Sequence, residues 1–156
     1  MIGVVVGAAG VALTAWIGDS RKSKREDVVF WRTERLGTYV EFAAATKRYV
    51  AILYRVAGHR GVDSSAQSLA LDAALPLLAE AFHRRDEVYE RVLLISRSDA
   101  ITTCAKAWVA KIYDLRALLD RPELGEPEWR AAVDEANARR AEFRDAVHHE
   151  IGIDGN

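Results

Sequence analysis

Residues 2–18, IGVVVGAAGVALTAWIG, contain no charged side chain, and this run limits most strongly what the chain can fold into. The basic run RKSKR follows at residues 21–25. An apolar segment that ends at a basic cluster is typical of a single membrane-spanning helix. A helix of this length reaches only about 25 Å, against a hydrocarbon core of roughly 30 Å, which is the short limit for a span. We therefore predict a transmembrane anchor in residues 1–20.

Three other structures compete with the anchor for this run. A cleaved signal peptide needs a basic region before the apolar run and a small-residue cleavage site, and residues 13–15, LTA, form a poor one. Residues 4–10, VVVGAAG, look like a strand that enters a nucleotide-binding glycine loop, but no later segment has the pattern of a strand. The third alternative is a core helix of the folded body. For each of these three alternatives, the sequence contains fewer of the required features than it does for a membrane anchor.

The distribution of charge around the apolar run predicts its orientation. Basic residues follow the run, whereas the short segment before it offers only the α-amino group. The positive-inside rule then places the N-terminus outside and the body of the protein in the cytoplasm, at the cell membrane. Lipid headgroups are the expected partners of the residues at the membrane interface. These residues are Trp16, Arg21, Lys22, Lys24, Arg25 and Trp31.

Two glycines in the apolar run have the spacing of a helix-dimerisation motif. Gly3 and Gly7 form a G-x-x-x-G pattern, which lets two helix backbones approach closely in a membrane. A homodimer through this face is therefore a possible assembly, with Gly3 and Gly7 at its centre. Glycine is also common in membrane segments for other reasons, so a monomeric anchor stays open.

The composition of the remaining chain fits a single all-α domain. The length of 156 residues accommodates one domain besides the anchor. The net charge of −1 gives no case for nucleic-acid binding. The only cysteine, Cys104, excludes an internal disulfide and fits a reducing cytoplasm. Strong helix formers are abundant and only three prolines occur.

The apolar periodicity predicts four helices, over residues 24–57, 63–95, 99–119 and 127–150. Short connections make successive helices antiparallel, so we expect an up-down four-helix bundle over residues 21–152, followed by a frayed tail at 153–156. Gly58 is expected to cap the first helix, and Ser64 with Gln67 matches a capping box for the second. Pro76 is expected to kink the second helix rather than to split it.

Each helix carries an apolar stripe that should face the bundle interior. On the first helix, residues recur every seven positions at 29, 36, 43, 50 and 57, and other apolar residues widen the stripe. The predicted core consists of Val29, Leu36, Tyr39, Phe42, Ala43, Tyr49, Val50, Ile52, Leu53, Val56, Ala57, Leu71, Leu75, Leu78, Phe82, Tyr89, Val92, Ile101, Ala105, Trp108, Ile112, Leu115, Leu119, Trp129, Val133, Ala136, Phe143 and Val147.

Two pairs of residues have the spacing of di-metal ligands in helical bundles. Glu80 and His83 form an E-x-x-H motif, and Asp145 with His148 is a near match. The helical angle of about 100° per residue turns both pairs away from the apolar stripes, so we predict that they face solvent. The adjacent His148 and His149 cannot converge on one ion from a helix. The sequence therefore predicts no metal or cofactor site.

Three further side chains have a weaker claim to a role. Cys104 lies close to the inward stripe of its helix and is expected to be a small buried hydrophobe rather than a nucleophile. Arg140 falls within the inward stripe of the last helix, and Arg139 at its edge. Glu41 or Glu34 could pair with these arginines inside the bundle, and an anion-binding cleft is the alternative.

With the helices placed, the chain resembles a broad group of small uncharacterised actinobacterial proteins that have an N-terminal transmembrane helix. The matching segments are the opening GVVVGAAG at 3–10, the pattern WRxxRxxxYxEF at 31–42, and the ending FRDAVHHEIG at 143–152. The histidine pair at 148–149 stands where an arginine-containing pair is expected in that group. The resemblance implies a membrane location and a helical body, and it supplies no catalytic residue.

These patterns predict a single-pass membrane protein that is not an enzyme. We expect its helical bundle to act through contacts with an unknown protein partner at the membrane. Two alternatives belong to other functional classes. The first is an enzyme or cofactor-binding bundle that uses the interior, and the second is a membrane-perturbing effector that oligomerises through its anchor.

Overall fold

The computed structural model describes the backbone of residues 5–152 and the side chains of residues 29–152. This part of the chain is all-α and contains no strand, as predicted. Its contacts divide the chain into two units, Met1–Glu34 and Arg35–Asn156. The four helices are α1 (Val5–His59), α2 (Leu71–Ile95), α3 (Asp99–Leu118) and α4 (Glu126–Ile151).

The predicted anchor and most of its flanking residues lie outside the described side chains. This holds for Gly3 and Gly7, for Trp16, and for the basic residues at 21–25; the predicted tail at 153–156 is also outside the described part. No helix in the described part of the chain combines the length and the apolar character needed to span a membrane. Trp31 is described and is half exposed.

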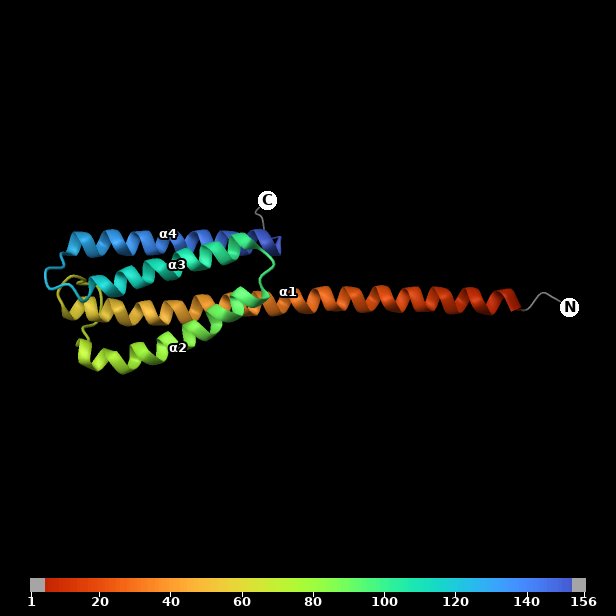
Figure 1. Cartoon of the computed structure of the whole chain (residues 1–156), viewed down its shortest axis with the longest axis horizontal. Helices are drawn as coiled ribbons and strands as arrows, with labels where there is room; N and C mark the ends of the chain where they lie inside the picture. The colour runs from red at the N-terminus through yellow and green to blue at the C-terminus, as the bar shows by residue number, and fades with distance from the viewer. Residues whose placement is uncertain (1–4, 153–156) are drawn as a thin grey trace. The chain divides into compact units, whose positions relative to one another are not determined.

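The second unit is the predicted four-helix body. Figure 1 shows its helices side by side, with successive helices pointing in alternate directions. Phe42 of α1 is fully buried where the helices meet. Its ring lies 5.8 Å from Tyr89 of α2, 5.5 Å from Trp108 of α3 and 5.2 Å from Phe143 of α4, measured between centroids. One aromatic side chain therefore packs against all three other helices.

The α1–α2 connection differs from the prediction, because α2 begins at Leu71 and not at residue 63. The carboxylate of Asp63 accepts hydrogen bonds from the backbone and hydroxyl of Ser65, at 3.0 and 2.6 Å, and from the indole of Trp129 at 3.2 Å. These bonds fix an Asx turn in place of the expected capping box at Ser64 and Gln67. The connection then runs back along α1, where the Leu69 N–H donates to the Arg55 carbonyl at 3.0 Å.

The end of α1 is a Schellman motif centred on Gly61 rather than a cap at Gly58. Gly61 has a φ of 73°, which a residue without a Cβ adopts without strain. Its N–H donates to the Gly58 carbonyl, and the N–H of Val62 donates to the Ala57 carbonyl, both at 3.1 Å. Gly58 is needed for a different reason. A Cβ there would lie 2.7 Å from the carbonyl oxygen of Ala66, so the connection can pack only against a glycine.

The buried face of α2 is rotated from the predicted stripe. Leu75 was expected to face inward and is 49% exposed, while its neighbour Ala74 is fully buried. Small residues at 74 and 81 let α2 pack closely against the other helices, which turns Leu75 outward. The same rotation buries Arg85, a charged residue that the apolar pattern did not place in the core. The helix runs unbroken through Pro76, as expected.

The inward residues of the other helices agree with the prediction, with one exception. Val29 is 64% exposed and belongs to the first unit, so it is not part of the bundle core. The predicted positions of α3 are all buried, as are most of those of α1 and α4. Leu36, Ala43, Val50 and Val133 are partly buried and pack against the core.

Candidate binding site

Two adjoining cavities lie between α1 and α4 and form the candidate site, which we call the α1/α4 groove. The larger has a volume of about 360 Å³ and the smaller of about 170 Å³. They share two lining residues, Trp108 and Arg140, and are therefore neighbours along the groove. The lining of the larger is Leu36, Tyr39, Val40, Ala43, Trp108, Arg140, Phe143, Arg144, Val147, His148 and Ile151. The lining of the smaller is Lys47, Val50, Ala51, Tyr54, Trp108, Ala136, Asn137 and Arg140.

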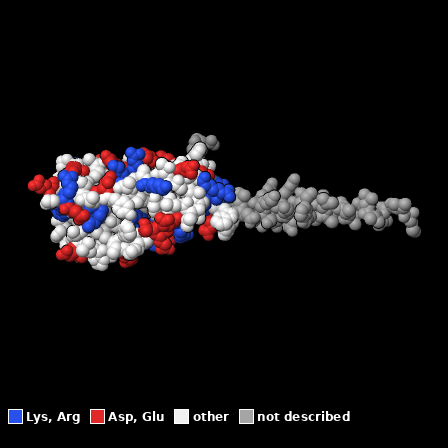
Figure 2. Space-filling model, viewed as in Figure 1, with Lys and Arg blue, Asp and Glu red and all other residues white. Residues whose placement is uncertain are grey.

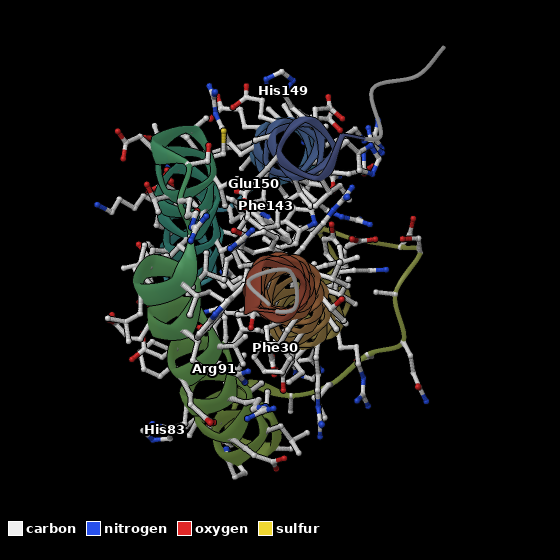
Figure 3. The ribbon with its side chains drawn as sticks, turned by 90° about the vertical axis from the view of Figure 1, so that its right-hand side faces the viewer. Phe30, His83, Arg91, Phe143, His149 and Glu150 are labelled. Atoms are coloured by element: carbon white, nitrogen blue, oxygen red, sulfur yellow. The ribbon has the colours of Figure 1, made fainter. Side chains whose placement is uncertain are left out.

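The floor of the groove is aromatic. Trp108 and Phe143 are both buried, and their ring centroids lie 5.8 Å apart. The Tyr39 ring meets Phe143 edge-on at 6.3 Å. Figure 3 shows Phe143 pointing from α4 into the bundle. Because Trp108 comes from α3, the groove reaches between α1 and α4 as far as the third helix.

The rim of the groove is basic. Lys47, Arg140 and Arg144 lie along it together with His148. Among the described residues that line the two cavities there is no Asp or Glu. Arg144 donates to the carboxylate of Asp145 at 3.2 Å, outside the lining. This one-signed lining differs from the face of the bundle shown in Figure 2, where acidic and basic side chains are interspersed.

A partly buried ion pair lies beside one end of the groove. The Nε of Arg35 lies 2.9 Å from Oε1 of Glu150, and both side chains are largely buried. The Tyr39 hydroxyl donates to the two carboxylate oxygens of Glu150 at 3.2 Å. Burial, together with the charge of Glu150, raises the pKa of Tyr39, so the phenol stays a hydrogen-bond donor. Figure 3 shows Glu150 pointing inward, whereas His149 beside it points away.

Tyr54 stands at the other end of the groove. Its ring meets Trp129 edge-on at 6.0 Å between centroids. Burial raises the pKa of Tyr54, while a hydrogen bond with Asn137 and the charge of Arg140 oppose that effect. At this end the groove is therefore lined by the neutral phenol of Tyr54 and the amide of Asn137, next to the basic residues of the rim.

The predicted partners of Arg140 are wrong. Arg140 is exposed at the groove rim rather than inside the bundle, and Arg139 pairs with Glu142 of its own helix at 2.7 Å. Glu41 instead binds two arginines of α2, Arg84 and, at 2.8 Å, Arg91. Figure 3 shows Arg91 between α2 and α1. Glu41 is thus engaged on the α2 side, whereas Arg140 and Arg144 of α4 line the groove.

The two pairs with metal-ligand spacing face solvent, as predicted. Glu80, His83, Asp145 and His148 are all exposed, and Figure 3 shows His83 pointing away from the bundle. Over the described residues, no three His, Cys, Asp or Glu side chains gather as metal ligands. Cys104 is partly buried against the core, and burial raises the pKa of its thiol, which lowers the thiolate fraction.

The apolar periodicity of the sequence does not indicate the roles of two arginines, Arg85 and Arg60. The Arg85 guanidinium lies within 4.8–5.1 Å of the ring centroids of Phe82, Tyr113 and Tyr49. Arg60, in the α1–α2 connection, donates to the carbonyls of Leu119 at 2.7 Å and Pro122 at 3.1 Å. It thereby satisfies carbonyl groups at the C-terminal end of α3. Both roles depend on tertiary contacts.

Comparison of the chain with protein-family models, with curated proteins and with solved structures finds no match.

Proposed function

We propose that this chain is a single-pass membrane protein that acts through contacts with a protein partner rather than by catalysis. In this proposal the N-terminus is outside and the bundle lies in the cytoplasm at the cell membrane. The charge-free run at 2–18 and the basic run at 21–25 support it. Val29, Phe30 and Trp31 add support, since they are 64%, 57% and 50% exposed. Consecutive exposed apolar and aromatic side chains are favoured near a bilayer surface.

The α1/α4 groove is the observation that carries the contact function. Val40 at its rim is 61% exposed, beside the partly buried Leu36 and Ala43. Apolar surface next to Arg140 and Arg144 fits a partner segment that presents apolar and acidic side chains. Most of the described surface residues are instead charged or polar, as on a solvated bundle. Membrane lipids are the second partner, through the residues at 21–25, and Gly3 with Gly7 offers a dimer contact.

The topology is tested with reporters fused to the full chain. A reporter that is active only in the cytoplasm should be active after Asn156, and one that is active only outside should be active before Met1. A body found outside the cell contradicts the proposed orientation. Release of the chain from membranes by alkaline carbonate contradicts the anchor.

The contact function is tested by site-specific photocrosslinking in native membranes. A photoreactive residue at Val40 should capture a defined protein, whereas one at Ala110, which is exposed on α3, should not. Capture should be lost in an Arg140→Glu/Arg144→Glu variant, because charge reversal repels the acidic side chains of the partner. Equal capture from Val40 and Ala110 contradicts the groove as the contact site.

A further inference from the structure

We propose that the α1/α4 groove binds a long-chain fatty acid, with the acyl chain over Trp108 and Phe143 and the carboxylate at Arg140 and Arg144. This inference rests on the proposed function only because both place a binding partner at the α1/α4 groove. It names a small ligand that would occupy the groove floor, whereas the protein partner would contact the rim. Three observations carry it: the depth of the groove, its apolar lining and its one-signed charge.

The depth favours a narrow ligand. Both cavities reach Trp108, which belongs to α3, so the space lies between α1 and α4 and ends on the third helix. Packed helices are about 8–10 Å apart, whereas a helix with its side chains is about 10–12 Å wide. A second helix therefore cannot reach the floor between two packed helices. An extended acyl chain can reach it.

The lining favours an apolar chain of some length. Leu36, Val147 and Ile151 line the larger cavity, and Val50 and Ala51 line the smaller. The larger volume, about 360 Å³, lies within the range of small-molecule sites, roughly 300–1,000 Å³. The two cavities together follow α1 from residue 36 to residue 54. A long chain can thus remain in contact with apolar side chains along much of its length.

The charge favours a carboxylate head group. Arg140 lines both cavities, with Arg144 on the same helix face. Guanidinium groups bind carboxylates through paired hydrogen bonds, and such charge-assisted bonds are the strong ones. No acidic side chain is among the described lining residues, and the acidic group that a ligand carboxylate would displace is Asp145, which accepts from Arg144 at 3.2 Å outside the lining. A cationic or neutral amphiphile would gain nothing from this rim.

The test uses the full chain in phosphatidylcholine nanodiscs with a palmitate analogue that carries a photoreactive diazirine at its chain end. Peptide mapping should place the label in residues 36–43 and 143–151. Unlabelled palmitate should compete. Hexadecyltrimethylammonium has the same chain with the opposite charge and should not compete, and octanoate should compete weakly because its chain is short.

Matched variants separate the groove from partition into the lipid. Arg140→Glu/Arg144→Glu should lower labelling about tenfold, because two charge-assisted bonds become repulsive contacts. Lys106→Glu changes an exposed cation on α3 and should leave labelling unchanged. Val40→Glu places a negative charge on the rim and should also lower labelling, whereas Ala110→Glu should not. Thermal melting of each variant establishes that it is folded.

The outcomes distinguish this inference from the proposed function. Labelling that is equal in the charge-reversed variant, or that hexadecyltrimethylammonium removes as well as palmitate does, overturns the fatty-acid site. Competition by phosphatidylglycerol vesicles but not by palmitate overturns it too, in favour of a phospholipid head group. Loss of fatty-acid labelling with protein capture at Val40 intact leaves the contact function standing. Labelling without capture supports the fatty-acid site and contradicts the protein contact.

Discussion

Arg85 donates a hydrogen bond from Nη2 to the hydroxyl of Tyr113, at 2.9 Å, from a position with no exposed surface. Within the described structure, Nε and Nη1 of the same guanidinium have no hydrogen-bond partner. Three aromatic faces surround the charge instead of a carboxylate. Burial of an unpaired charge is costly, and cation–π contacts offset only part of that cost. The Arg85–Tyr113 pair is therefore a sensitive point of the bundle.

The free energy of unfolding of the Tyr113→Phe variant should be about 1–3 kcal/mol lower than that of the wild type, because the buried, charged Arg85 loses its hydrogen-bond acceptor. Arg85→Met should be neutral or stabilising, because it replaces a buried ion by an apolar side chain of similar length. In the Arg85→Met background, Tyr113→Phe should have little effect. Urea titrations of the four proteins give the coupling energy, and additive effects would contradict the pair.

The Phe42→Ala variant should lose about 3–5 kcal/mol of unfolding free energy, because it empties the position where all four helices meet. Val40→Ala lies on the same helix, but its side chain is mostly exposed, so the expected loss is below about 0.5 kcal/mol. Thermal denaturation followed by circular dichroism measures both. A small effect at Phe42 would show that the aromatic contacts do not hold the helices together.

Substitution by alanine should change the stability of the bundle in opposite directions at the two glycines in the bundle part of α1, Gly37 and Gly58. Gly58→Ala should destabilise by about 1–3 kcal/mol, because its Cβ would meet the Ala66 carbonyl oxygen. Gly37→Ala has open space around the new Cβ and should stabilise the helix by about 0.5–1 kcal/mol. The melting temperatures should therefore move apart. A stabilising effect at Gly58 would mean that the connection does not pack there.

The carboxylate of Asp63 should make the stability of the bundle depend on pH. Burial raises the pKa of Asp63, but hydrogen bonds from Ser65 and Trp129 outweigh it and lower the pKa below its usual value. Because the pKa is lower in the folded state, the ionised carboxylate stabilises the fold at any pH above the unfolded-state pKa, about 3.9. This stabilisation is lost as the pH falls through the folded-state pKa. Asp63→Asn should therefore destabilise at pH 7 and have a shrinking effect below about pH 4. Glu123→Gln, exposed in the α3–α4 connection, is the control.

The helices could be predicted from the sequence because their burial follows the 3.6-residue period. All six inward residues predicted for the third helix are buried, from Ile101 in α3 to Leu119 just after it. The prediction fails where a tertiary contact competes with a local signal. Ser64 and Gln67 match a capping box, but Asp63 is held by the indole of Trp129, and the helix starts later. Leu75 is apolar, yet the smaller Ala74 packs inside.

The candidate site was predictable only in part. The sequence indicated Arg140 as a possible anion ligand, but a periodicity cannot show that Glu41 is already bound to Arg84 and Arg91. The groove depends on the distance between α1 and α4 and on Trp108 from a third helix. No local pattern encodes such a distance. The exposed metal-like pairs were predictable, since their direction follows from the helical angle alone.

The Arg60 side chain ties two connections together at one end of the bundle. It joins the α1–α2 connection to the α3–α4 connection, through the carbonyls of Leu119 and Pro122. At the opposite end, where the cavity reaches Leu36 and Ile151, the Arg35–Glu150 ion pair and the hydrogen bonds from Tyr39 to Glu150 join α1 to α4. With α1 and α4 tied at this end and their connections tied at the other, a chain-shaped guest enters the groove from its rim, along its side, while the register of the helices is kept.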